Sequence, residues 1–164
     1  MAGRWLLKSL AALGLAAVGM VGYVAAGAWM AAYGPPSADA LAMEARLLAL
    51  PTSPVPIATL RPQEDWDIAC RLDPYSFPSR VLPGYLGKPL PGYHYDPTDA
   101  WIDENWNGLA FIDDASRVIH VLTLPNKKIH DLEGERCVGR ATGKVALARI
   151  EAPNSTFLRI EFSE

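Results

Sequence analysis

The chain has 164 residues, of which 50% are hydrophobic, and its formal net charge at pH 7 is −3. Most of the charge lies in residues 63–164, where 11 basic and 16 acidic side chains give −5. Such an acidic surface repels nucleic-acid backbones and anionic headgroups, so nucleic acid is excluded as an expected partner.

The first segment of the chain is almost free of charge. Arg4 and Lys8 are the only charged side chains before Asp39, and the most apolar stretch covers residues 10–33. A helix needs about 20 apolar residues to cross the hydrocarbon core of a bilayer. We therefore expect residues 9–33 to form a transmembrane signal anchor.

Positive charge orients such an anchor, because it stays on the cytoplasmic side. We therefore expect residues 1–8 to be cytoplasmic, with a single pass through the inner membrane and a periplasmic C-terminal domain. Residues 26–28 and 38–40 resemble signal-peptide cleavage sites, so secretion after cleavage is the alternative. Small residues spaced four apart in the segment would also let two helices pair, which allows a helix-mediated oligomer.

Residues 34–62 are expected to link the anchor to the domain. Residues 37–50 predict a short helix, capped by Ser37 or Asp39 and ended by Pro51. The prolines between positions 51 and 62 predict a semi-rigid extended spacer. We interpret the helix as a stalk.

Residues 63–164 are expected to form an exported β-rich domain, with α+β as the alternative, around an antiparallel sheet of about five strands. A first strand is predicted at residues 67–72. Residues 74–97 contain six prolines, which predict irregular structure because regular strands tolerate proline only at edges and bulges.

Two hairpins give the clearest strand signals. Residues 109–112 and 117–124 flank turn-forming residues at 113–116. Because residues 117–124 are largely apolar on both faces, we expect this strand to be central in the sheet.

The second hairpin is predicted from residues 144–150 and 157–162. Residues 125–132 are expected to form a short helix between the two hairpins. The glycine-rich residues 139–144 lack the spacing of a phosphate-binding loop and predict a turn between strands.

Cys70 and Cys137 are the only cysteines of the chain. In an oxidising periplasm, two cysteines in one small domain usually pair. A disulfide that closes a loop of this length contributes about 4 kcal/mol in the chain-entropy model. We therefore predict a structural bridge, because the C-x-x-C spacing of a redox pair is absent.

Aromatic side chains are densest in the proline-rich region. They are interpreted either as a partner-binding surface or as a cover over a small β core. The candidate partner-binding residues are Tyr75, Tyr85, Tyr93, Tyr95, Trp101 and Trp106.

Oxygen-rich side chains near position 100 are weak metal candidates, because their spacing matches no calcium-binding loop. These residues are His94, Asp96, Asp99 and Asp103. His120 is expected to be partly buried within a strand, and His130 to lie at the surface. No catalytic residue and no cofactor are predicted.

Together these features predict a membrane-anchored, extracytoplasmic accessory or binding protein. It would serve an envelope protein partner as a small subunit, an assembly factor or an immunity-type protein. The alternative is a periplasmic hydrolase or metal-dependent enzyme that uses His94 and the nearby carboxylates.

Overall fold

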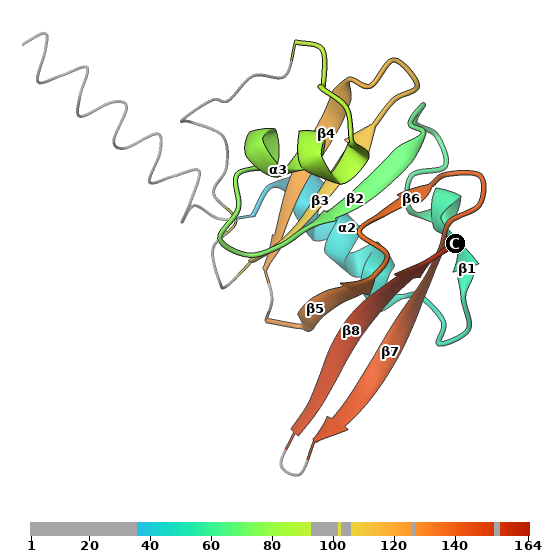
Figure 1. Ribbon diagram of the computed structural model, residues 1–164. Coiled ribbons are helices and arrows are strands. Elements are labelled where there is room, and N and C mark those ends of the chain that lie inside the picture. Colours follow the sequence, from blue (N-terminus) through green and yellow to red (C-terminus); the bar gives the residue numbers. More distant parts are fainter. Residues whose placement is uncertain (1–35, 93–101, 103–105, 126, 153–154) are drawn as a thin grey trace, which may run out of the picture. The chain divides into compact units, whose positions relative to one another are not determined.

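A computed structural model describes residues 36–92, 102, 106–125, 127–152 and 155–164 (Figure 1). The expected anchor at residues 9–33 lies outside this part of the chain. None of the helices that the structure does describe is long and apolar enough to span a bilayer.

The described residues form a mainly β domain. Its elements are α2 (Ala38–Leu48), β1 (Val55–Pro56), the 3-10 helix η1 (Ile57–Leu60), β2 (Ile68–Leu72), α3 (Pro78–Leu86), β3 (Trp106–Ile112), β4 (Val118–Pro125), β5 (Ile129–Gly134), β6 (Cys137–Gly139), β7 (Lys144–Ala152) and β8 (Ser155–Ser163).

The strands form two four-stranded sheets instead of the single sheet of about five strands that we expected. Sheet A has the order β1-β7-β8-β5, and sheet B has the order β4-β3-β2-β6. All described neighbours are antiparallel except β5 and β8, which run parallel. The expected mainly β, antiparallel-rich fold is confirmed.

Sheet B is covered on both faces. Leu109 and Phe111 of β3 face a first core, which sheet A and α2 also line. Ala110 and Ile112 face a second core, which is covered by Leu82 of α3. Alternate residues of a strand point to opposite faces, so β3 supplies both cores at once.

The expectation that residues 117–124 form a central strand is wrong. β4 lies at the edge of sheet B, and its Ile119 is 38% exposed. The register between β3 and β4 shifts between Phe111 and Ile112, which breaks the simple alternation assumed from the sequence. The central, two-faced strand is β3, which is buried from Asn107 to Ile112.

The helix at residues 38–48 is confirmed, but its interpretation as a stalk is wrong. The Ser37 hydroxyl accepts a hydrogen bond from the Ala40 backbone N–H (3.0 Å) and caps the helix. Its apolar face, with Met43 and Leu47 fully buried, packs into the first core. This burial makes α2 a part of the domain, because an amphipathic helix is stabilised mainly by covering its apolar face.

The residues after α2 also belong to the domain and do not form an extended spacer. β1 pairs with β7, and Ile57 and Leu60 of η1 are buried in the first core. The Arg46 guanidinium donates to the Leu60 carbonyl (2.6 Å) and ties α2 to η1.

Two further local predictions are wrong. Residues 78–86 form helix α3 within the stretch expected to be irregular; Pro78 occupies its first turn, and Gly87 at φ 65° ends it. Residues 129–134 form strand β5 where a helix was expected, because they pair with β8 and bury Ile129 and Leu132.

Replacing Leu47 by alanine tests the role of α2. Leu47 is 0% exposed in the first core, so Leu47→Ala is expected to lower the free energy of unfolding by about 2–5 kcal/mol. Leu41→Ala is the matched control, because Leu41 is 46% exposed on the same helix, and a change within about 0.5 kcal/mol is expected. Urea unfolding measures both; equal effects would show that α2 does not support the core.

Candidate partner-binding site

The structure describes three of the six aromatic residues predicted to bind a partner. Tyr75 lies in the turn after β2, Tyr85 lies on α3, and Trp106 begins β3. The remaining candidates and the weak metal candidates lie outside the described residues: Tyr93, Tyr95, Trp101, His94, Asp96, Asp99 and Asp103.

The predicted disulfide between Cys70 and Cys137 is confirmed. The two residues are directly opposite in the antiparallel pair of β2 and β6, with Cα atoms 4.1 Å apart. Cys70 is fully buried in the second core, where Leu82 of α3 also packs. The bridge therefore joins the two strands in the core that supports α3.

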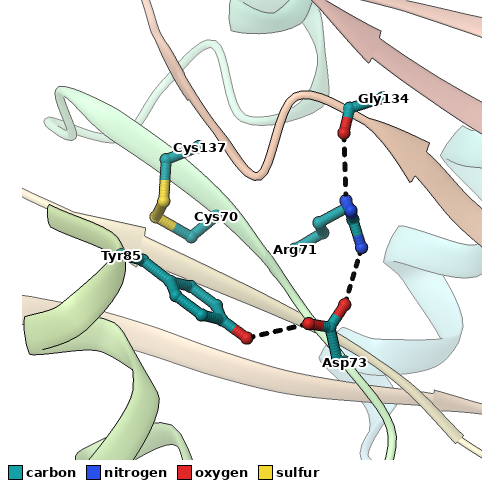
Figure 2. The surroundings of a disulfide bond; sticks show 6 residues. All are labelled: Cys70, Arg71, Asp73, Tyr85, Gly134 and Cys137. Atoms are coloured by element: carbon teal, nitrogen blue, oxygen red, sulfur yellow. Dashed lines mark hydrogen bonds and ion pairs between the residues drawn. A yellow bond between two sulfur atoms is a disulfide. The ribbon is translucent and has the colours of Figure 1, made fainter.

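The residues beside the two cysteines converge on one carboxylate, that of Asp73 (Figure 2). Arg71 Nη1 lies 2.7 Å from Asp73 Oδ1, and Arg136 Nη2 lies 3.1 Å from Oδ2. The Tyr85 hydroxyl donates to Oδ2 (3.0 Å), and the Arg136 guanidinium lies 4.5 Å from the centre of the Tyr85 ring. We call Arg71, Asp73, Tyr85 and Arg136 the Asp73 cluster.

The Asp73 cluster fastens α3 to sheet B through polar contacts. Arg71 Nε also donates to the carbonyl of Gly134 (3.4 Å), so the cluster reaches the end of β5 (Figure 2). Partial burial of Tyr85, followed by its hydrogen bond to Asp73, raises the pKa of the phenol above its ordinary value of 10.0. The neutral phenol is therefore the form that the fold favours.

Tyr75 combines an exposed ring with a strained backbone. Its φ is 60°, in the left-handed region that non-glycine residues seldom adopt, and its side chain is 60% exposed. Backbone bonds to Ile102 keep it there: the Tyr75 N–H donates to the Ile102 carbonyl, and the Ile102 N–H donates to Ser76 (3.0 Å). Ile102 itself is fully buried in the second core.

This strain has little compensation from burial of the Tyr75 ring. The left-handed conformation costs about 1–2 kcal/mol for a residue with a side chain. Such outliers persist where the surroundings impose them, and they cluster at functional sites. Trp106, in contrast, is half-buried against the second core and helps to cover it. Tyr75 is thus the described aromatic best placed to contact a partner.

A second polar cluster, which the sequence analysis missed, surrounds Arg61. This guanidinium is 2% exposed and pairs with the carboxylates of Asp39 and Glu64. Burial alone would lower its pKa, but the hydrogen bonds to Glu64 and Asp39 outweigh burial and raise the pKa above its ordinary value. The available sequence signal was its position as the only charge in the proline-rich residues 51–62.

The Arg61 cluster ties α2 to the body of the domain. The guanidinium lies 5.1 Å from the centre of the Phe111 ring. Glu64 also approaches His120, at 3.0 Å from Nε2, and His120 is partly exposed, as expected. No described hydroxyl or thiol is bonded to this imidazole, so the contacts of this pair are those of a structural ion pair.

The surface beside this cluster has a depression of about 410 Å³ at the β3–β4 turn. Its lining includes Asp113, Asp114 and Arg117. The backbone N–H of Arg117, and then its side chain, bond to Asp113 and lower the pKa of that carboxyl. Asp113 is thus already engaged by its own hairpin, and the described residues contain no group of His, Cys, Asp or Glu suited to a metal ion.

Two smaller expectations agree with the structure. His130 is exposed on β5, and residues 139–144 connect β6 to β7 through a turn closed by the Gly143 N–H and the Gly139 carbonyl (2.7 Å).

Comparison of the chain with protein-family models, curated proteins and solved structures found no match. A functional proposal must therefore be based on the chemistry of this chain alone.

Replacing Tyr85 by phenylalanine tests the Asp73 cluster. Near neutral pH the loss of the hydroxyl is expected to lower the free energy of unfolding by up to about 1 kcal/mol, because the hydrogen bond is only partly shielded from solvent. A raised phenol pKa gives stability that is fully present below the ordinary value and is lost as pH rises through the folded value.

The difference between wild type and Tyr85→Phe should therefore shrink as pH rises from about 8 to about 11. Urea unfolding of both proteins across this range measures it. A difference that stays constant would show that the phenol does not titrate against Asp73.

Proposed function

We propose that this protein is a membrane-anchored accessory or binding protein of the cell envelope. It would sit in the inner membrane by residues 9–33 and present the domain of residues 36–164 to an envelope protein partner in the periplasm. A small subunit, an assembly factor and an immunity-type protein all fit this description.

The observation that carries this proposal is the disulfide between Cys70 and Cys137 within the second core. Disulfides persist in oxidising compartments such as the periplasm and are rare in the cytosol. The uncharged segment that precedes the domain supplies an export signal of suitable length. Two independent features of the chain thus point to the same compartment.

The nature of the surface favours binding over catalysis. Tyr75 presents an exposed aromatic ring on a rigid turn, next to a helix fastened by the Asp73 cluster. Tyrosine gives a large contact area at low entropic cost, which suits protein recognition. We therefore place the partner surface around Tyr75 and α3.

The compartment is tested by fusing alkaline phosphatase or green fluorescent protein after Glu164. Export predicts an active phosphatase and a dark fluorescent protein. In the same cells, alkylation without reductant should leave Cys70 and Cys137 unlabelled, whereas Cys137→Ser should expose Cys70 to the reagent. A fluorescent fusion with an inactive phosphatase, or two labelled thiols in the wild type, would refute the proposal.

The binding surface is tested by Tyr75→Gly. Glycine adopts a positive φ freely, so the free energy of unfolding should stay constant or rise by up to about 1 kcal/mol. Loss of the ring should weaken partner capture about tenfold. The readout is the yield of crosslinked partner from native membranes, identified by mass spectrometry.

Ile119→Ala is the matched control for this experiment. Ile119 is 38% exposed and belongs to β4, which meets the end of β3 farthest from Tyr75. Capture should be unchanged in this variant. If Tyr75→Gly is destabilised, or captures the partner normally, Tyr75 is a structural residue and the surface lies elsewhere.

The enzymatic alternative depends on His94, which lies outside the described residues. A His94→Ala variant that loses a measured activity while its melting temperature is unchanged would favour the alternative.

A further inference from the structure

The hairpin formed by β7 and β8 has a free backbone edge along its outer half. In Figure 1 this hairpin extends past β1 and β5. β1 pairs with β7 only at Val145 and Lys144, and the carbonyl of Pro51 accepts from the Leu147 N–H (3.0 Å). Beyond Leu147, no described segment pairs with this edge of β7.

The direction of the backbone groups identifies which residues form the free edge. In an antiparallel ladder, the N–H and C=O of alternate residues point to the same side of the strand. Leu147 points away from β8 because it bonds to Pro51. Arg149 and Glu151 therefore point the same way, and within the described residues their backbone groups have no protein partner. Such an edge is a template for another strand.

The side chains along this edge are complementary to themselves. Arg149 and Glu151 are both exposed and carry opposite charges on either side of Ile150. If a second copy of β7 pairs antiparallel about a two-fold axis at Ile150, each Arg149 lies directly opposite Glu151 of the other copy. Opposite charges at such positions stabilise a pair of strands, and like charges destabilise it. Glu151 also accepts from Thr156 Oγ1 (2.9 Å) through one carboxylate oxygen.

The other face of the hairpin supports the same register. Ile150 pairs across the hairpin with Phe157, which is 37% exposed and stacks on His130 at 4.8 Å. The small side chains of Ala148 and Ala152 flank Ile150, so the two Ile150 side chains could meet at the axis. The pairing would cover residues 148–152 and stop short of Leu147, where Pro51 already occupies the edge.

We propose that two copies of this chain associate edge to edge through β7, with Arg149 of each copy opposite Glu151 of the other. The two A sheets then form one continuous sheet across the two-fold axis, as expected of an isologous interface. This inference is independent of the proposed function, and it differs from pairing through the N-terminal helix because its determinants lie on β7.

Charge exchange on β7 tests the proposal with the full-length protein in detergent. R149E places Glu opposite Glu twice across the axis, and E151R places Arg opposite Arg twice. Either change should weaken dimerisation in sedimentation velocity about tenfold or more. The double variant R149E/E151R restores both attractive pairs and should recover the dimer. Circular dichroism melting curves should be unchanged, because both side chains are exposed.

A protein that sediments as a monomer at every concentration would overturn the proposal. So would single variants that dimerise like the wild type, which is the result expected of pairing through the N-terminal helix. Failure of the double variant to recover would also overturn it, because charge complementarity would then not explain the association.

A cysteine at the axis gives a second measurement that does not depend on charge. Residues directly opposite in a non-hydrogen-bonded antiparallel pair have Cα atoms about 4.5 Å apart, which is within reach of a disulfide. Ile150→Cys should therefore give a crosslinked dimer on oxidation. Ser155→Cys is the matched control: three strand spacings separate its two copies by at least about 14 Å, and it should stay uncrosslinked. No crosslink at position 150, or equal crosslinking at both, would overturn the proposal.

Discussion

The covalent joining of β2 to β6 is the constraint on which the rest of the domain depends. Cys70 and Cys137 are separated by 67 positions in the sequence, and closing a loop of this length contributes about 4 kcal/mol in the chain-entropy model. A domain of this size buries a modest core, so this contribution is a large part of its stability. The bridge also brings Arg71 and Arg136 to the same carboxylate, which links covalent chemistry to the placement of α3.

The second constraint is the burial of sheet B on both faces. A sheet covered on both sides needs two sets of partners, and α2 and α3 supply them from opposite sides. α2 brings apolar side chains to the first core and the buried Arg61 cluster to its rim. α3 brings Leu82 to the second core and Tyr85 to the Asp73 cluster. A chain segment that looks like a connection in the sequence thus becomes part of the core.

The strained and unpaired features lie away from these two cores. Tyr75 has a left-handed backbone and an exposed ring at one end of sheet B, and β7 carries a free edge on sheet A. Both features cost or forgo stability within the domain, and both offer groups that another molecule could use. The well-packed cores allow these surfaces to persist.

Local chemistry in the sequence predicted those elements whose causes lie within a few residues. The Ser37 cap, the turn at residues 113–116 and the β7–β8 hairpin all depend on neighbours in the chain. The two cysteines predicted their own bridge, because no other cysteine was available to either. Of the candidate site, the sequence identified the aromatic residues but could not separate exposed Tyr75 from half-buried Trp106.

Tertiary structure alone decided the features that depend on distant partners. Residues 129–134 became a strand because β8 offered a parallel edge, and residues 117–124 became an edge strand because a register shift beside Phe111 changed their pairing. α2 became a core helix because sheets A and B left an apolar space for Met43 and Leu47. Burial and strand pairing are properties of surfaces brought together by the whole fold, so short stretches of sequence do not determine them.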